Sequence, residues 1–576
     1  MNADVLLAYY ERIAEAPDAI NRLRRFMLDL AVRGKLVPQD PADEPASELL
    51  KRISLEKAQL VKTGQARADK AFPTGEDDAL FGLPESWCWT RLGTVSAYIQ
   101  RGKSPKYAVS VGTPVVSQKC VQWRGLDLSV AKLVTLESIA EYETVRFLRD
   151  GDLLWNSTGT GTIGRVIRLV TPPDRLVCDS HVTVVRCFGV DPEFVRTWLR
   201  SDHVFGTIEE RAAGSTNQVE LTAQMVVNQL VPLPPLAEQH RIVAKVDELM
   251  ALCDRLAAAR TTREVTRDRL AAASLARLNT PDSETFSADG RFALNTLPAI
   301  TTRPDQIKQL RQTILNLAVR GKLVPQDSGD EPASLLISTM RRNFSNSGDR
   351  KASTRFAPIA DDQLSYSTPA GWEWACAEDL TIPGEVITYG ILKPEWVENG
   401  VPTVRVTEMK TGTIDVATLP KCSPARAASF TRTTLAEGDL LVSKDGTIGK
   451  TAFVPSELVG GNITQHVLRF PISTVVDRHF VKLVIDAPPY QALMAGETKG
   501  VALQGVNVGD FRRMPIPLPP LAEQHRIVAK VNVLMALCDQ LEASLATAST
   551  SRAKLLEATL REALLPTEET LLEAAQ

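Results

Sequence analysis

Apolar side chains recur at helical spacing in two stretches of the chain that are close copies of each other. Within each stretch they are separated by three, four and three residues, which is the stripe of a helix that buries one face. The first stripe consists of Val246, Leu249, Cys253 and Leu256, and the second of Val531, Leu534, Cys538 and Leu541. Helix-favouring residues continue from the first stripe to Leu278, so we predict a helix of about 40 residues, roughly 60 Å long.

A second amphipathic helix is predicted before each copy of the sequence LAVRGKLVPQD. Its apolar positions have the same spacing and are Ile20, Leu23, Met27 and Leu30, then Ile307, Leu310, Ile314 and Leu317. Gly34 and Gly321 follow these positions and are typical of the residue that ends a helix. Because such helices bury their stripes against one another, we expect them to pair as antiparallel coiled coils.

The order of the repeated blocks indicates a closed arrangement. PLPPLAEQHRIVAKV occurs at 232–246 and 517–531, and LAVRGKLVPQD followed by DEPAS occurs at 30–47 and 317–334. The middle of the chain therefore holds both blocks, whereas the N-terminal part holds only the second and the C-terminal part only the first. Bringing the two ends together would rebuild the middle, which predicts a ring-like arrangement with pseudo-twofold symmetry.

Two segments of equal length, Trp87–Val231 and Trp372–Ile516, separate the blocks and are rich in β-branched residues and turn signals. We interpret them as mixed α/β domains joined by the long helices, which gives an α+β fold. The predicted regions are helical at 1–60, mixed at 80–232, helical at 233–345, mixed at 365–517 and helical at 518–576. Trp87, Trp89, Trp372 and Trp374 are expected to anchor the cores where the chain enters these domains, rather than to stack on nucleobases.

The sequence GTGTIG at 159–164 matches G-x-G-x-x-G, the pattern of loops that bind dinucleotide phosphates. Such a loop must open into a helix, but here the β-branched RVIRLVTPP follows. The related KDGTIGKT at 444–451 lacks the first glycine of a P-loop. We interpret both as hairpin turns, either purely structural or also placing backbone amides near DNA phosphates. DAPPY at 486–490 differs by an inserted alanine from an amino-methyltransferase motif, so no catalytic centre is predicted.

Composition narrows the class of protein further. The 576 residues suffice for about three or four domains, and no apolar run is long enough for a membrane helix. The N-terminal MNADVLLAYYERIAEA does not resemble a signal peptide, and the eight scattered cysteines include no C-x-x-C pair. We therefore expect a cytoplasmic protein with no disulfide framework and no metal site. With a net charge of −3, any DNA binding must depend on local basic patches or basic partners.

Polar residues are identical in the two copies of the PLPPLAEQ block, although helix packing alone would tolerate changes there. Two identical surfaces suggest two identical partners around the pseudo-twofold axis. Recent duplication is the alternative, but it predicts similar identity throughout, and the intervening domains have diverged. The expected partner-binding residues are Glu238, Gln239, His240, Arg241 and Lys245, with Glu523, Gln524, His525, Arg526 and Lys530 in the second copy.

These paired blocks, alternating with two variable domains, resemble the specificity subunit of type I restriction–modification systems over nearly the whole chain. The resemblance implies that each variable domain is a target-recognition domain for one half of a bipartite, asymmetric sequence in double-stranded DNA. It implies that the helices set the spacing between the half-sites and bind two modification (methyltransferase) subunits, which restriction (translocase/nuclease) subunits then join. It places S-adenosylmethionine, ATP and Mg in those partners, so this chain is expected to be non-catalytic and to hold no cofactor.

Residues that could read DNA were sought among basic, amide and hydroxyl side chains on predicted loops. In the first domain the candidates are Arg101, Lys103, Lys106, Tyr107, Gln118, Lys119, Arg124, Asn217 and Gln218. In the second domain they are Tyr389, Lys393, Arg405, Lys410, Lys444, Lys499 and Gln504. His181 and His466, which lie 285 residues apart beside predicted strands, are either structural or in contact with bases or phosphates.

Two other classes of protein remain to be separated from this interpretation. A self-contained methyltransferase or NTPase would need a genuine cofactor loop, and the glycine motifs fail on their context. A coiled-coil scaffold that pairs two copies of a non-DNA partner would share the repeated helices. Salt-dependent DNA binding by the assembled complex distinguishes that scaffold from a DNA-recognition subunit.

Overall fold

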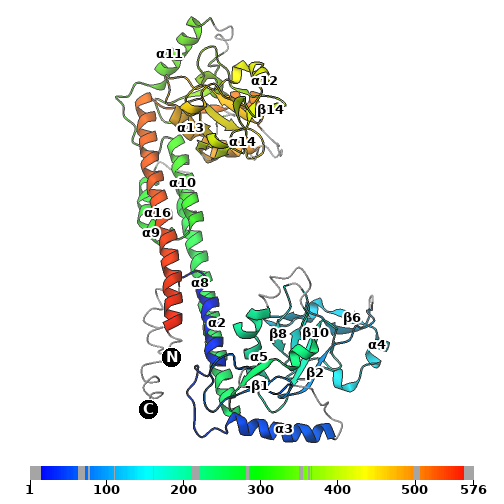
Figure 1. The fold of residues 1–576 in the computed structure, drawn as a ribbon. Coiled ribbons are helices and arrows are strands. Elements are labelled where there is room, and N and C mark those ends of the chain that lie inside the picture. Colours follow the sequence, from blue (N-terminus) through cyan, green and yellow to red (C-terminus); the bar gives the residue numbers. More distant parts are fainter. Residues whose placement is uncertain are drawn as a thin grey trace. The chain divides into compact units, whose positions relative to one another are not determined.

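The computed structural model describes residues 15–62, 72–75, 78–108, 111–159, 161–208, 220–279, 284–348, 355–360, 364, 366–410, 412–496 and 506–562 (Figure 1). The chain forms two compact units. The first unit comprises residues 1–262 with 549–576, and the second comprises residues 263–548. Both boundaries lie inside long helices, α8 (Leu236–Asn279) and α16 (Leu521–Glu562). Helices and several small sheets occur in each unit, so the predicted α+β class is confirmed.

Outside its mixed domain, the described helices of the first unit are α2 (Ala19–Val32), α3 (Ala46–Lys62) and the parts of α8 and α16 that belong to it. Helix α2 runs antiparallel to α8, because Arg24 pairs with Asp254 while Gln39, further along the chain, pairs with Glu238 earlier in α8. Helix α8 has 44 residues, close to the length expected from its sequence. Within the described residues, none of the helices combines the length and apolarity required to cross a membrane.

The helical segments nearest the two chain ends are neighbours in the first unit. Leu556 and Leu560 of α16 share an apolar cluster with Leu23 and Leu30 of α2. Arg22 of α2 also donates a hydrogen bond to the Ala553 carbonyl, at 3.4 Å. This contact confirms that the N-terminal and C-terminal helices meet, as the order of the repeated blocks predicts.

The helices of the second unit are α9 (Phe286–Ile300), α10 (Pro304–Val319), α11 (Ala333–Asn346) and the remaining parts of α8 and α16. Helix α10 runs antiparallel to α16, since Arg311 pairs with Asp539 at 2.6 Å and Gln326, beyond the helix, pairs with Glu523 at 2.7 Å. These contacts repeat those of the first unit at the corresponding residues. The antiparallel pairing predicted for the two short helices is therefore confirmed in each unit.

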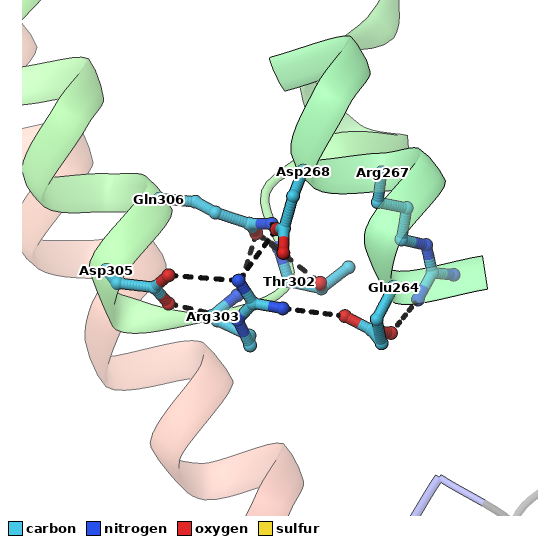
Figure 2. Close-up of polar contacts among 7 residues, drawn as sticks. All are labelled: Glu264, Arg267, Asp268, Thr302, Arg303, Asp305 and Gln306. Carbon is cyan, nitrogen blue, oxygen red and sulfur yellow. Dashed lines mark hydrogen bonds and ion pairs between the residues drawn. The ribbon is translucent and has the colours of Figure 1, made fainter. Parts of the chain in front are cut away.

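An ionic cluster fastens the start of α10 to α8 in the second unit (Figure 2). The Arg303 guanidinium lies 3.0 Å from Glu264, 2.7 Å from Asp268 and 2.9 Å from Asp305. Gln306 donates a hydrogen bond to Asp268 at 2.9 Å and accepts one from the Arg303 backbone N–H at 3.1 Å. The cluster thus caps α10 and fixes its first turn on the neighbouring helix.

The first mixed domain contains four sheets and several short helices. Strand β1 (Cys88–Arg91) pairs with β11 (Leu230–Leu233), and a four-stranded sheet has the order β2 (Ser96–Arg101), β10 (Val182–Cys187), β7 (Leu153–Asn156), β8 (Val166–Arg168). A three-stranded sheet orders β6 (Lys132–Val134), β3 (Thr113–Val116) and β9 (Val177–Cys178), and β4 (Val121–Gln122) pairs with β5 (Gly125–Leu126). The short helices are η2 (Leu128–Val130), α4 (Leu136–Ala140), η3 (Thr144–Arg146), α5 (Pro192–Leu199), the π-helical turn η4 (Asp202–Gly206) and α7 (Ala223–Val227).

The second mixed domain repeats this arrangement of sheets with one additional strand, β14. Strand β12 (Glu373–Cys376) pairs with β23 (Pro515–Leu518), and the next sheet orders β13 (Thr388–Tyr389), β22 (Val467–Phe470), β19 (Leu440–Ser443) and β20 (Thr451–Phe453). A third sheet has the order β14 (Trp396–Val397), β18 (Lys421–Cys422), β15 (Val401–Val404), β21 (Asn462–Ile463). Strand β16 (Met409–Lys410) pairs with β17 (Thr413–Ile414). Its short helices are η7 (Ala377–Leu380), η8 (Val416–Thr418), α12 (Pro424–Ala428), η9 (Thr431–Thr433), η10 (Ser456–Leu458), α13 (Arg478–Asp486), α14 (Pro488–Ala495) and α15 (Val508–Arg512).

The strands that open and close each mixed domain pair with each other directly before the long helix. Thr90 lies opposite Val231 in the first domain, and Ala375 lies opposite Ile516 in the second. Trp87 and Trp372 are buried beside these pairs, whereas Trp89 and Trp374 are half-buried. The expected core-anchoring role is confirmed most clearly for Trp87 and Trp372. The two mixed domains are therefore attached to the long helices α8 and α16 in the same way, although their sequences have diverged.

Candidate nucleic-acid interface

The identical PLPPLAEQ blocks form a buried joint between helix and mixed domain. Glu238 has no exposed surface, and its two carboxylate oxygens accept hydrogen bonds from Trp87 Nε1 at 2.9 Å and Gln39 Nε2 at 2.6 Å. Burial raises the pKa of the Glu238 carboxyl, although the hydrogen bonds from Trp87 and Gln39 act to lower it. Glu523 repeats the arrangement with Trp372 at 3.0 Å and Gln326 at 2.7 Å.

The neighbouring glutamine completes the joint. Gln239 is also fully buried; its side-chain oxygen accepts the Asp191 backbone N–H at 2.8 Å, and its amide donates to the Pro234 carbonyl at 2.9 Å. Gln524 makes the same two contacts with Asp477 and Pro519. Because each amide bridges the α5 or α13 N-cap and the start of the long helix, a change at this position would leave buried polar groups unpaired.

An ion pair explains why DEPAS is repeated together with PLPPLAEQ. The Arg241 guanidinium contacts both carboxylate oxygens of Asp43, at 2.6 and 3.2 Å. Arg526 contacts Asp330 in the same way, at 2.6 and 3.1 Å. Paired bidentate contacts of this kind fix geometry as well as charge, so each ties its DEPAS segment to the long helix.

These contacts correct the prediction of a partner surface. Glu238, Gln239, Glu523 and Gln524 are buried in contacts within the chain, so a partner cannot bind them as predicted. Arg241 and Arg526 are already engaged by Asp43 and Asp330. Exposed side chains remain at the other predicted positions: His240 is 63% exposed and His525 62%, and Lys245 and Lys530 lie on the same helices. For those four residues, partner binding stays a prediction.

The glycine motif joins two antiparallel strands, as predicted. Residues 159–164 connect β7 to β8, and residues 444–450 connect β19 to β20. A strand follows each motif instead of the helix that a nucleotide site needs. The hairpin interpretation is confirmed, whereas contact between its backbone amides and DNA phosphates stays a prediction.

Several loops meet at one end of the first mixed domain. Gly102 approaches the β9–β10 turn so closely that a Cβ atom there would lie 2.2 Å from the Asp179 carbonyl oxygen. Beside it, Arg101 Nε donates to the Ser180 carbonyl at 2.9 Å, and Ser104 lies 3.0 Å from the Ser180 hydroxyl. The loop after β2 is therefore held directly on the β9–β10 turn.

The β7–β8 hairpin and the turn after β3 join the same group of loops. Asn156 Nδ2 donates to the Gln118 carbonyl at 3.0 Å, and the Thr158 hydroxyl lies 2.7 Å from His181 Nδ1. Four segments of the chain, the loop after β2, the turn after β3, the β7–β8 hairpin and the β9–β10 turn, are thus in contact at this end. Such loops on a rigid β scaffold are the usual location of binding residues.

The predicted DNA-contact residues of the first domain differ in how available they are. Arg101 pairs with Glu220, and Arg124 pairs with Asp127 at 2.8 Å but is otherwise well exposed. Lys103, Lys106, Tyr107 and Lys119 are exposed, and Gln118 is half-buried. Lys103 lies 5.7 Å from the Tyr142 ring centre, and Lys132 lies 4.7 Å from that of Tyr107. Asn217 and Gln218 lie outside the described residues.

In the second domain most of the predicted basic residues have carboxylate partners. Arg405 contacts Glu408 at 2.6 Å, Lys410 contacts Asp415 at 3.2 Å, and Lys444 contacts Asp445 at 2.6 Å. Asp445 also lies 2.8 Å from His466 Nδ1; although burial opposes the effect, Lys444 and His466 together lower the pKa of Asp445. Tyr389 and Lys393 are exposed, and Lys499 and Gln504 lie outside the described residues.

Exposed tryptophans near these loops escaped the sequence-based prediction. Trp123 is partly exposed at the tip of the β4–β5 hairpin, and the Arg200 guanidinium lies 5.4 Å from its ring centre. Trp396 is exposed on β14, with Arg405 5.8 Å away. The signal was a tryptophan next to a polar or charged residue, in QWRG and in PEWVE. Among the described residues, no group of His, Cys, Asp and Glu is placed to hold a metal ion.

The chain is similar to specificity subunits along most of its length. It is 28% identical to the EcoEI type I restriction enzyme specificity subunit of Escherichia coli, covering 94% of this chain and 93% of that protein. It is 27% identical to the EcoAI specificity subunit of the same organism, with the same coverage. Residues 393–547 match the family model described as type I restriction modification DNA specificity domain.

Two solved structures are also similar to this chain, each with a lower sequence identity than these two curated proteins. A chain in a structure of a type I restriction–modification system is 20% identical, with a TM-score of 0.46, covering 84% of this chain and 98% of that one. The HsdS subunit from Thermoanaerobacter tengcongensis is also 20% identical over the same shares, with a TM-score of 0.43. The similarity to the curated sequences runs through both mixed domains and both copies of the repeated blocks. Its sequence is thus similar to type I restriction–modification specificity subunits over 94% of its length.

Proposed function

We propose that this chain is the DNA sequence-specificity subunit of a type I restriction–modification complex. The observation that carries the proposal is similarity over 94% of the chain to two proteins that are named as specificity subunits. The duplicated architecture supports it, because two copies of one topology present loop tips of different sequence. Each mixed domain then reads one half of a bipartite, asymmetric DNA target, and the chain itself carries out no reaction.

The remaining parts of the proposal concern partners. Two methyltransferase subunits bind the scaffold, restriction subunits join them, and the complex works in the cytoplasm on double-stranded DNA. S-adenosylmethionine, ATP and Mg belong to those partners in this proposal. The positions that remain accessible in both copies are His240, Lys245, His525 and Lys530, although Lys245 also lies 2.9 Å from Glu248, which Val533 replaces in the second copy.

The test is to express the chain with its methyltransferase subunits and to map methylated bases in the host genome. The expected result is one split motif with two unrelated halves and a constant gap. Binding of the complex to that motif should weaken steeply as salt increases, because phosphate contacts release counterions. A scaffold for a non-DNA partner would instead leave the genome unmodified and show no sequence-dependent DNA binding.

A further inference from the structure

We propose that His203 is a positioning residue that couples scaffold helix α2 to the loop tips of the first mixed domain. His203 lies on η4, a single π-helical turn, and such turns are rare and frequent at functional sites. Two positions apart on a helical turn, His203 and Phe205 point to roughly opposite sides. One side of η4 faces α2, and the other faces the hairpins that form the candidate DNA interface.

The scaffold side of η4 is polar and specific. His203 Nε2 lies 2.9 Å from Oδ1 of Asp29 on α2 and 3.3 Å from Nη2 of Arg33, the residue that follows this helix. The imidazole also stacks on Trp198, with ring centres 5.7 Å apart and planes at 19°. The Phe81 ring centre lies 4.9 Å from that of His203, so two aromatic rings pack against the imidazole. The ring is therefore held in one orientation by contacts from three separate segments.

The chemistry at Nε2 selects one hydrogen-bonding state. A single ring nitrogen cannot donate to the carboxylate and accept from the guanidinium at the same time. The shorter distance is to Asp29, so Nε2 carries a proton and donates to that carboxylate. Asp29 also accepts from Arg33 Nε at 2.9 Å, and although burial opposes the effect, these partners lower its pKa.

The other side of η4 packs against the hairpins. The Phe205 ring meets Trp123 edge-on, with centres 4.9 Å apart, at the tip of the β4–β5 hairpin. A Cβ atom on Gly164, at the end of the β7–β8 hairpin, would lie 3.1 Å from Phe205 and 3.3 Å from Ile208. A movement of η4 relative to α2 would therefore change how the β4–β5 and β7–β8 hairpins pack against Phe205.

The second unit keeps a hairpin contact, but the position that corresponds to His203 is Pro488, whose side chain has no polar atom. Pro488 and Pro489 begin α14, and they border a groove of about 510 Å³ shared with Asn316 of α10 and with Arg320, which follows that helix. Gln491 still donates to the Gly449 carbonyl of the β19–β20 hairpin, at 3.0 Å. The second hairpin is therefore a control within the same chain, since it should not respond to α2.

The first experiment measures amide hydrogen exchange in the full chain. His203→Phe keeps an aromatic ring on Trp198 but removes the hydrogen bond to Asp29, and we expect exchange in the β4–β5 and β7–β8 hairpins to become severalfold faster. Peptides of the β19–β20 hairpin should be unchanged. His203→Gln, which retains an N–H donor for Asp29, should recover part of the protection. Faster exchange confined to α2 and η4 would overturn the coupling.

A milder variant and a control keep the test decisive if His203→Phe unfolds locally. Asp29→Asn keeps an acceptor but removes the charge, so it should produce the same pattern in the hairpins at smaller amplitude. Asp254→Asn weakens another ion pair of α2, that with Arg24, which lies more than one helical turn before Asp29, and should leave the hairpins unchanged. Equal effects of Asp254→Asn and Asp29→Asn would show general loosening of α2 and reject the proposal.

The second experiment rests on the proposed DNA function and uses the complex with methyltransferase subunits. His203→Phe should relax the sequence requirement of the half-site read by the first domain and leave the other half-site unchanged. If wild-type complexes methylate no split motif, the proposed function fails while the exchange result still judges the coupling. If the motif exists and both half-sites keep full stringency in His203→Phe, the coupling does not position the reading loops.

Discussion

The buried Glu238 carboxylate accepts hydrogen bonds from two protein donors in place of water. Its oxygens satisfy Trp87 and Gln39, which come from the mixed domain and from the segment after α2. A buried hydrogen-bonding group that loses its partner costs more than the net value of one hydrogen bond. The joint at Glu238 therefore stabilises the attachment of the first domain, and Glu523 does the same for the second domain.

Glu238→Ala should lower the free energy of unfolding of the first unit by about 2–4 kcal/mol, because it leaves the Trp87 and Gln39 donors unpaired. Glu523→Ala should destabilise the second unit by a similar amount. Thermal unfolding of the full chain would show either change as a lower midpoint for one transition. His240→Ala, next to Glu238 but exposed, is the control and should shift the midpoint little; a comparable loss there would contradict a specific joint.

The same carboxyl predicts a pH dependence. Burial raises the pKa of Glu238 above its ordinary value of 4.5, against the lowering effect of Trp87 and Gln39. The folded state then holds the proton more strongly than the unfolded state, so this contribution to stability is lost as pH rises through the raised pKa. Glu238→Gln cannot titrate, so the difference between its unfolding midpoint and that of the wild type should move in favour of the variant as the pH rises from 4.5 into the neutral range. A constant difference across that range would contradict the raised pKa.

Among the secondary-structure elements, the long helices gain their positions through side-chain pairs that recur in both units. Arg24 with Asp254 and Arg311 with Asp539 occupy corresponding places on α2–α8 and α10–α16. The Arg303 cluster has no such repeat, because Ala16 and Ser549 stand where Arg303 and Glu264 would be expected from the sequence spacing. The start of α10 is therefore fastened by charge, whereas Ala16 belongs to an apolar cluster.

Arg303→Met should weaken the attachment of α10 to α8 by about 1 kcal/mol, since partly exposed ion pairs contribute little individually but act here as a network. Amide exchange in the first turns of α10 should become faster, and high salt should reproduce part of the effect in the wild type. Arg277→Met, which removes another α8 ion pair with Asp289, serves as the control. Unchanged exchange in α10 would show that apolar packing alone fixes this helix.

Partner binding by the exposed positions can be tested by stoichiometry. Replacing His240 and Lys245 by Glu should remove one methyltransferase from a complex that contains two, and replacing His525 and Lys530 by Glu should remove the other. Native mass spectrometry gives the composition directly. Arg255→Glu is the control, because Arg255 is exposed on the same helix but differs from Gln540 in the second copy. Full occupancy in both double variants would place the docking surface elsewhere.

Helical elements were predictable to the extent that one face of each is apolar. The stripes at Leu23–Leu30 and Val246–Leu256 predicted α2 and α8. Helix α9 lies in the region predicted to be helical, but it was not predicted as a separate helix, because Phe286–Ile300 contains Pro298 and follows turn-like residues. The sheet order was not predictable, since parallel pairs such as β3 with β9 join residues far apart in sequence. Buried Glu238 was mistaken for a surface residue because a sequence shows polarity but not the donors that Trp87 and Gln39 supply.

For the molecule as a whole, the division into two units has a functional consequence under the proposed function. The two mixed domains share one topology, yet their loop tips carry different chemistry. Gly159 in the first hairpin is replaced in the second by Lys444, which pairs with Asp445. Because the scaffold joints at Glu238 and Glu523 are identical, exchanging a domain at its terminal strands preserves how it is attached. Reading and spacing should therefore be separable properties.

This separation gives the last prediction. Inserting four residues, about one helical turn, near Ala257–Ala259 of α8 would lengthen that helix by about 6 Å. DNA rises about 3.4 Å per base pair, and the helix need not lie parallel to the DNA, so the gap should grow by about one or two base pairs. Replacing Trp87–Val231 by another such domain should instead change one half-site and leave the gap constant. Methylation maps of the two strains decide the matter, since a domain swap that altered both half-sites, or an insertion that changed base identity, would show that one element performs both tasks.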